Sequence, residues 1–281
     1  MTSNLILKRF FSKAMLHDLL SDKQNDIFDC VIEKYVPEPQ GKTYSELISD
    51  VYSYIGKEYR TEYFYKNTLL NKLMLKKHDY KKTIALTELP IANSKADFVM
   101  INGRGVVYEI KTELDNLDRI NSQILDYQKA FSEIFIVTYQ ENLEKVMELV
   151  PEKIGIMQLT KRKALKVIRE PISDTSNFDY YTIFKLLRKG EFENIIKSNG
   201  FLLPEVVQFE YYKECFNLIQ NIEIETLQAQ MLKELKKRMK TEIVELSLNV
   251  PVELRGLTYF DNTVLAYQNS FEIMLNKSYG G

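Results

Sequence analysis

Two short apolar runs joined by a turn lie near the middle of the chain, between residues 95 and 111. Residues 98–101 form the first run, and residues 106–110, interrupted only by Glu109, form the second. Between them stands Asn102-Gly103, the dipeptide most typical of a tight β-hairpin. Because both runs are almost continuously apolar, they predict two strands that are covered on both faces, in the middle of a sheet.

Three charged residues interrupt this apolar hairpin, and a buried charge is costly unless it is paired or holds a metal. Glu109 and Lys111 are two residues apart, so on a strand they point to the same face. A two-residue turn would set Asp97 opposite Tyr108, whereas a three-residue loop over residues 102–104 sets it opposite Glu109. We take the second register, in which one face carries two carboxylates beside an ammonium group.

Two carboxylates and a backbone carbonyl are suitable ligands for a hard divalent cation such as Mg²⁺ or Mn²⁺. A neighbouring lysine can orient a metal-bound water, and such a site is suited to hydrolysing phosphodiesters. The alternative is a structural ion pair between Glu109 and Lys111. A second Glu-x-Lys triplet, at Glu234-Leu235-Lys236, is typical of an ordinary exposed helix face. What favours the metal site is the combination of the upstream acid, the turn and the apolar flanks.

Asp97 and Glu109-Ile110-Lys111 resemble the core motif of the PD-(D/E)XK nuclease superfamily, with Ala96 where the motif has proline. The similarity covers residues 60–138, and the run 85–115 is similar to a poorly characterised bacterial family within that superfamily. The resemblance implies a restriction-endonuclease-like fold and a metal held by Asp97, Glu109 and the Ile110 carbonyl, with Lys111 positioning the attacking water. It also implies a nuclease, with DNA as the favoured substrate and RNA left open, in phage defence or DNA repair.

The resemblance extends to three further candidates, each with a plainer alternative. In the superfamily a glutamate from the helix before the sheet often completes the metal site, which here implies Glu62. A glutamate favoured by the helix dipole at a helix start is the alternative. Gln123 and Tyr127 resemble a Gln-x-x-x-Tyr motif of RecB-like members, which implies that they lie beside the active site. A polar pair at the sheet-facing edge of the helix could contact substrate phosphate or hold Lys111 in place. A surface glutamine and a core tyrosine are the alternative. Apart from the resemblance, Glu88 in the strand expected at 83–91 either faces solvent at the strand end or lies near the site.

The hydrophobic periodicity of the rest of the chain predicts a mixed α/β (α+β) fold, in which a mixed central sheet is flanked by helices. We expect a helical segment over 1–58, a nuclease-like core over 59–172 and a mainly helical accessory region over 173–281. Further strands are expected at 83–91, 134–138, 154–159 and 165–168. Expected helices include 5–20, 26–34, 43–55, 60–77, 115–131 and 143–150.

The amino-acid composition limits the kinds of partner and cellular compartment that the sequence predicts. With a net charge of −1 and a pI near 6.3, any nucleic-acid binding must use local basic patches. Candidate patches are Lys161-Arg162-Lys163, Lys76-Lys77-His78 and Lys81-Lys82. Cys30 and Cys215 are far apart and form no disulfide or zinc pattern, which favours a reducing cytoplasm. Neither a signal peptide nor a run of membrane-spanning length is expected.

A second hypothesis belongs to another class. The chain would be a non-catalytic binding or regulatory protein on a nuclease-like scaffold, acting through its C-terminal helices on a protein partner or a second copy of itself. Related scaffolds host varied functions, so the resemblance alone does not exclude this. The presence of all three central motif residues favours the nuclease.

Overall fold

The computed structural model describes residues 3–76 and 78–280, so Lys77 of one predicted basic patch lies outside the described residues. The chain folds into two compact units. The first comprises the described parts of Met1–Lys81, Leu159–Leu165 and Met239–Gly281, and the second comprises Lys82–Gln158 and Lys166–Arg238. Each unit is thus assembled from segments that are distant in sequence. The predicted three-part division along the chain stays a prediction.

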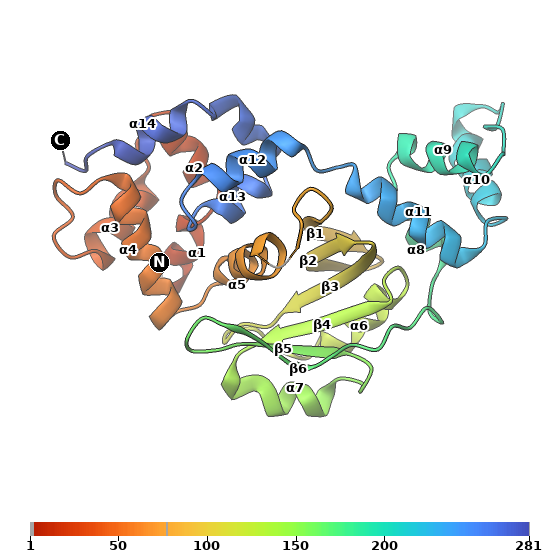
Figure 1. Cartoon of the computed structure of the whole chain (residues 1–281), viewed down its shortest axis with the longest axis horizontal. Coiled ribbons are helices and arrows are strands. Elements are labelled where there is room, and N and C mark those ends of the chain that lie inside the picture. Colours follow the sequence, from red (N-terminus) through yellow and green to blue (C-terminus); the bar gives the residue numbers. More distant parts are fainter. Residues whose placement is uncertain (1–2, 77, 281) are drawn as a thin grey trace. The chain divides into compact units, whose positions relative to one another are not determined.

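A six-stranded mixed sheet forms the centre of the second unit, which confirms the predicted mixed α/β class (Figure 1). The strands follow chain order across the sheet. β1 to β3 pair antiparallel, and β3 to β5 pair parallel. Their bounds are β1 (Ile84–Ile91), β2 (Ser94–Asn102), β3 (Arg104–Ile110), β4 (Glu133–Thr138), β5 (Gly155–Leu159) and β6 (Leu165–Arg169).

The β2–β3 hairpin has the register predicted from a three-residue loop. Asn102 pairs with Arg104, and Phe98 pairs with Tyr108. Gly103 stands alone at the tip with φ of +73°, a left-handed conformation that glycine adopts without a steric cost. The described pairs end at Phe98 and Tyr108, and continuing their register by one residue sets Asp97 opposite Glu109.

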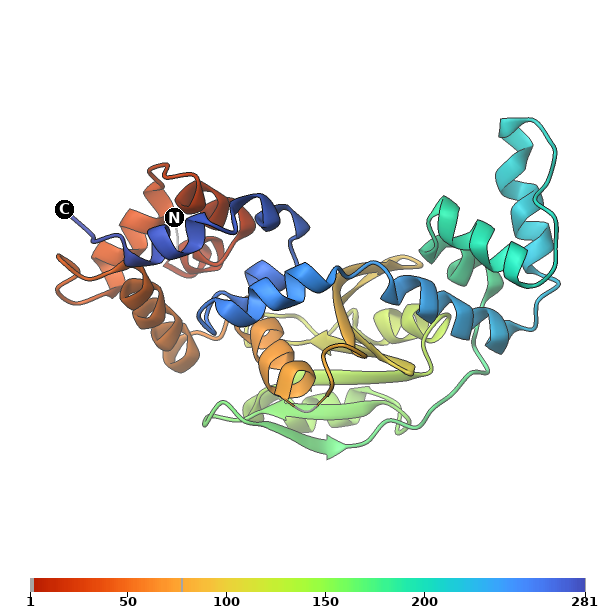
Figure 2. The ribbon, with the colours of Figure 1, turned by 45° about the horizontal axis from the view of Figure 1, so that its top comes forward.

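Helices cover the sheet of the second unit (Figure 2). α6 packs against β2 and β4, α8 against β1, and α11 against β3. Gly105 permits the last of these contacts, because a Cβ there would lie 2.7 Å from a methyl carbon of Leu232 and 2.8 Å from the ring of Phe131. The helices are α6 (Ile120–Gln128), η2 (Gln140–Asn142), α7 (Leu143–Leu149), α8 (Tyr180–Leu186), α9 (Lys189–Ser198), α10 (Gln208–Ile219) and α11 (Ile224–Lys236).

The first unit is helical and combines both ends of the described chain. Asn67 joins them: its side-chain amide donates to the Tyr52 hydroxyl (2.8 Å) and the Val252 carbonyl (2.9 Å), and its Oδ1 accepts from the Gly256 N–H (2.9 Å). The helices are α1 (Ser3–Phe10), α2 (Lys13–Leu20), α3 (Asp26–Tyr35), α4 (Tyr44–Glu58), α5 (Glu62–Thr68), η1 (Leu69–Leu75), α12 (Thr241–Asn249), α13 (Arg255–Tyr259), η3 (Asn262–Tyr267) and α14 (Ser270–Asn276).

The residues after α14 pair with the loop before α4. The Tyr44 N–H donates to the Lys277 carbonyl, and the Tyr279 N–H donates to the Lys42 carbonyl, both at 2.9 Å. Thr43 and Ser278 form an antiparallel bridge between these contacts. The first unit is therefore closed by a short backbone ladder between segments from opposite ends of the sequence.

Two helix predictions in this unit were wrong in detail. The single helix predicted over 5–20 is interrupted, because the Ser12 hydroxyl caps a second helix by accepting from the Met15 N–H. The helix predicted over 60–77 begins at Glu62 and widens to a π-helix over Leu69–Leu75. There the Asn71 side chain donates to the Asn67 carbonyl, the group that the Asn71 backbone N–H would use in an α-helix.

None of the described helices is both long and apolar enough to cross a membrane.

Candidate active site

Glu109 lies at the centre of a buried polar network in the second unit. It is near the end of β3, is only 2 % exposed, and has hydrogen bonds to both carboxylate oxygens. Oε1 accepts from Lys111 Nζ (2.8 Å) and from Gln123 Nε2 (2.5 Å). Oε2 accepts from the Tyr127 hydroxyl (2.7 Å). The surrounding side chains therefore compensate the buried charge and fix the orientation of the carboxylate.

Lys111 directly follows β3 and is 6 % exposed. Its backbone is held by β4: its N–H donates to the Val137 carbonyl (2.9 Å), and its carbonyl accepts from the Thr138 hydroxyl (3.1 Å). Its ammonium group donates to Glu109 Oε1 and, at 2.7 Å, to Gln123 Oε1. The parallel β3–β4 pair thus places the lysine and keeps its ammonium beside the acid.

Gln123 and Tyr127 reach this network from α6, where positions four residues apart lie on one face. The Tyr127 hydroxyl also lies 2.8 Å from the Lys95 carbonyl, so its single proton is shared between two acceptors. Burial, and then the negative charge of Glu109, raise the pKa of Tyr127 well above 10. Tyr127 is consequently a neutral donor that orients Glu109.

Asp97 lies on β2, half-buried beside this network. Its Oδ2 accepts from the backbone N–H of Ile110 at 2.8 Å, which connects β2 to the end of β3. A carboxylate oxygen of Glu88 on β1 lies within 4.8 Å of one from Asp97. Glu88 is exposed and has φ of +53°, an uncommon backbone conformation for a glutamate. Acidic residues thus stand on three neighbouring strands.

The residues present fit a hard divalent cation, since their donors are carboxylate and carbonyl oxygens. Asp97, Glu109 and the Ile110 carbonyl are the candidate ligands, and Glu88 is close enough to Asp97 to contribute. Both oxygens of Glu109 already accept hydrogen bonds, so its coordination to a metal would replace one of them. If metal coordination replaced the hydrogen bond from Lys111 to Glu109, the Lys111 ammonium group would become available to a substrate.

Glu62 belongs to the first unit, so its contribution to this site stays a prediction. It is the first residue of α5, directly after the capping residue Thr61, and it is exposed. Its carboxylate pairs with Lys66 one turn later. Within its own unit Glu62 has the surroundings of a helix-start glutamate.

The Lys95 carbonyl was absent from the sequence-based candidates. It orients Tyr127, and through it Glu109. Because every residue carries a carbonyl, no sequence signal distinguishes this one.

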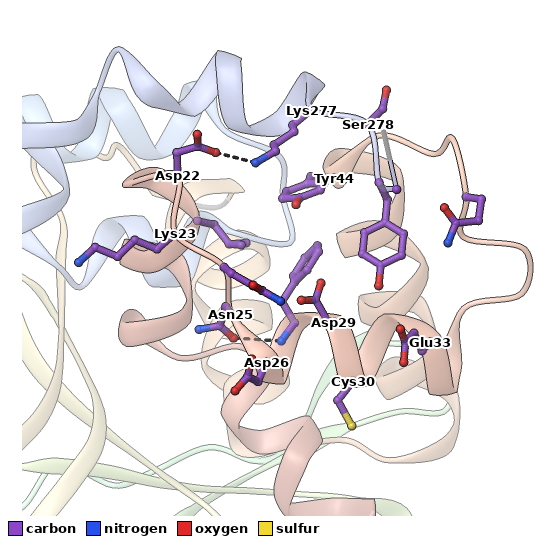
Figure 3. Close-up of a pocket in the computed structure, with 16 residues that line it drawn as sticks. Asp22, Lys23, Asn25, Asp26, Asp29, Cys30, Glu33, Tyr44, Lys277 and Ser278 are labelled. Atoms are coloured by element: carbon purple, nitrogen blue, oxygen red, sulfur yellow. Dashed lines mark hydrogen bonds and ion pairs between the residues drawn. The ribbon is translucent and has the colours of Figure 1, made fainter.

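A separate cavity of about 730 Å³ lies in the first unit and contains none of the predicted site residues (Figure 3). Acidic side chains dominate its charged lining, namely Asp22, Asp26, Asp29 and Glu33. Lys277 supplies an internal cation: its Nζ donates to Asp22 at 2.6 Å and lies 5.8 Å from the centre of the Tyr44 ring. The cavity is thus suited to positive groups, and a lysine of the same chain already provides one.

Comparison with known proteins places the chain in a family. Residues 56–250 match the family of bacteriophage P4 protein cII, which is more than half of the sequence. The chain belongs to this family. The matched range includes both segments of the second unit, and hence the whole Glu109 network.

Protein cII of Enterobacteria phage P4 is 21 % identical over 139 residues, covering 48 % of this chain and 51 % of that protein. The chain therefore matches about half the length of this curated relative. Among solved structures, a protein of unknown function from Silicibacter pomeroyi is similar with a TM-score of 0.30 and 13 % identity. That similarity covers 45 % of this chain and 88 % of the other.

Proposed function

We propose that the second unit is a divalent-metal-dependent nuclease of the PD-(D/E)XK type that hydrolyses phosphodiester bonds. DNA is the favoured substrate, with RNA as the alternative. The observation that supports this most directly is the Glu109 network, with the half-buried Asp97 beside it. A purely structural ion pair needs one acid and one base, whereas here a second acid lies on the same side of the hairpin. The sequence resemblance to the superfamily supports the same assignment.

In this proposal Asp97, Glu109 and the Ile110 carbonyl hold Mg²⁺ or Mn²⁺, with Glu62 as a further candidate ligand. A bound cation of this kind would acidify the attacking water and neutralise charge on the phosphate. Lys111 donates hydrogen bonds to the water or to a phosphoryl oxygen as negative charge develops. Gln123 accepts from Lys111 and donates to Glu109, so it links the two groups by hydrogen bonds that do not depend on the direct Lys111–Glu109 bond.

The proposal is tested by cleavage of labelled single- and double-stranded DNA and of RNA, with Mg²⁺, Mn²⁺ or EDTA. We expect Asp97→Asn and Lys111→Met each to reduce cleavage by about 10²-fold or more, because each removes a group that acts on the reacting phosphate. Glu113→Gln is the matched control, since Glu113 is an exposed acid two residues beyond Lys111. Calorimetry with Mg²⁺ or Mn²⁺ should show weaker binding by Asp97→Asn. Undiminished cleavage by that variant would refute the assignment.

The biological setting is part of the proposal. The sequence resemblance implies phage defence or DNA repair in the cytoplasm, and the two free cysteines are compatible with a reducing compartment.

A second candidate function is favoured by exposed apolar side chains of the second unit. Leu202, Val207 and Phe209, on and just before α10, are 89 %, 67 % and 95 % exposed. Three large apolar side chains exposed within eight residues of sequence are consistent with a protein–protein contact. A regulatory protein acting through these helices, on a partner or a second copy, would bind it equally well with Asp97→Asn, whereas a nuclease would lose its activity.

A further inference from the structure

Positive side chains from three separate segments meet in the first unit. Lys57 lies in the last turn of α4, Arg60 just beyond it, Lys72 on η1, and Lys163 in the turn between β5 and β6. We call these four residues the lysine cluster. The turn was one of the basic patches predicted from the sequence, but its grouping with residues of α4 and η1 comes from the fold alone.

Hydrogen bonds hold the turn of the lysine cluster in place. The Arg60 guanidinium donates to the carbonyls of Gly56 (3.3 Å), Leu159 (3.1 Å) and Lys161 (2.9 Å). The Lys72 ammonium donates to the Lys163 carbonyl. These bonds use backbone carbonyls as acceptors, so they leave the positive charges of Arg60 and Lys72 without a compensating carboxylate.

Lys163 is held in an unusual position. Its φ is +61°, in the left-handed region, and its Nζ lies 5.5 Å from the centre of the Phe64 ring. Gly56 makes this approach possible, because a Cβ there would lie 2.6 Å from Lys163 Nζ and 2.8 Å from the Phe64 ring. Glycine near the end of a helix costs stability relative to alanine, and here it admits an ammonium group against the helix.

The lysine cluster is unfavourable for the isolated protein. Burial lowers the pKa of Lys163, and the charges of Lys57, Arg60 and Lys72 lower it further. Among the described residues, none of the cluster's members forms an ion pair with an acid. Glu58, next to Lys57 in sequence, is exposed. Repulsion of this kind is relieved when an anion binds.

We propose that the lysine cluster binds the phosphodiester backbone of a nucleic acid. Lysines act as point charges toward phosphate, and several of them together can neutralise phosphates of a nucleic-acid strand. Segments 56–72 and 159–165 contribute no exposed large apolar side chain, so the surface lacks the anchors of a membrane-binding patch. The choice of nucleic acid rests on the proposed nuclease function, whereas the anionic character of the ligand rests on the cluster alone.

The test measures binding of a short fluorescent DNA duplex by anisotropy in EDTA, over a range of salt concentrations. Lys57→Gln/Lys72→Gln/Lys163→Gln removes the lysine charges and keeps the side-chain length. We expect affinity to fall by about tenfold or more and the slope of log affinity against log salt to decrease by about 2 to 3, because each lost phosphate contact contributes roughly 0.9. Lys23→Gln/Lys233→Gln/Lys240→Gln is the matched control, since these exposed lysines form no ion pair within the described chain and carry the same charge.

Thermal unfolding checks the fold and provides an independent readout. Removing like charges should leave the Tm of the triple variant equal to or above that of the wild type, whereas a merely structural cluster would lower it. Gly56→Ala leaves the charge unchanged but displaces Lys163, so it should weaken DNA binding on its own. Equal affinity and salt slope in the triple variant and its control would overturn the inference, as would binding to anionic vesicles but not to DNA.

Asp97→Asn separates this inference from the proposed activity. If this variant binds DNA as the wild type does but no longer cleaves it, both proposals are supported. If the triple variant loses binding while no form of the protein cleaves, the cluster is a nucleic-acid surface and the nuclease proposal fails. If cleavage depends on Asp97 but the triple variant binds DNA normally, the nuclease proposal is supported and the lysine cluster is not a nucleic-acid surface.

Discussion

Individual residues decide the character of the candidate site. A buried lysine and glutamate two positions apart on a strand must share a face, so their pairing was foreseeable from the sequence alone. The position of Asp97 required one further choice, the length of the hairpin loop, and the register of Phe98 with Tyr108 confirms that choice. The contact of Tyr127 with the Lys95 carbonyl could not be foreseen, because it depends on how α6 lies across β2.

Glu109→Gln should reveal how strongly the network depends on its central charge. The substitution keeps the shape but leaves the Lys111 ammonium buried without a counter-charge, and we expect it to reduce the free energy of unfolding by about 3 kcal/mol. Adding Lys111→Met should restore part of this loss, because the uncompensated charge is then removed as well. Urea denaturation of the two single variants and the double variant measures the coupling between them. Simple additivity would show that the two side chains are energetically independent.

At the scale of elements, periodicity located most helices and strands but failed where side chains compete for backbone groups. The Ser12 cap divides one predicted helix, and another becomes a π-helix where the Asn71 amide donates to the Asn67 carbonyl. Neither effect changes the spacing of apolar residues, so the pattern of hydrophobic positions cannot reveal either of them. The hairpin was easier to predict because its turn dipeptide carries its own conformational preference.

The hairpin tip gives a test at this scale. Gly103 has φ of +73°, so Gly103→Val should reduce the free energy of unfolding by about 1 to 2 kcal/mol, whereas Gly103→Asn should be nearly neutral. Urea denaturation measures both, and NMR contacts between Phe98 and Tyr108 report whether the register is kept. Equal losses in the two variants would mean that side-chain size, rather than backbone conformation, limits the turn.

At the scale of the whole molecule, the sequence predicted least about which segments join to form each compact unit. The mixed sheet was predicted from its strands, but the joining of residues near the start of the chain to residues beyond 239 was not. That joining depends on buried polar contacts such as those of Asn67, whose partners Val252 and Gly256 are far away in sequence. Long-range pairing of this kind leaves no local pattern in a single sequence.

Asn67→Ala tests how the first unit is held together. It leaves the Val252 carbonyl and the Gly256 N–H without their partner, and we expect the unit to lose about 3 kcal/mol of stability. Amide hydrogen exchange should be faster in α5 and α13, with β3 and β4 unchanged. Asn121→Ala, at an exposed position of α6, is the control and should change neither set. Equal acceleration in both units would show that the chain unfolds as one cooperative body.

The ladder between residues 42–44 and 277–279 affects the order in which the protein folds during its synthesis. Both segments of the second unit precede residue 239, so that unit can form while the remaining chain is still being translated. The helices of residues 3–76 contact one another, but their contacts with residues 239–280 form only once that later segment has been synthesised. A nascent chain would therefore carry a complete sheet domain while the helices of residues 3–76 still lack their contacts with residues 239–280.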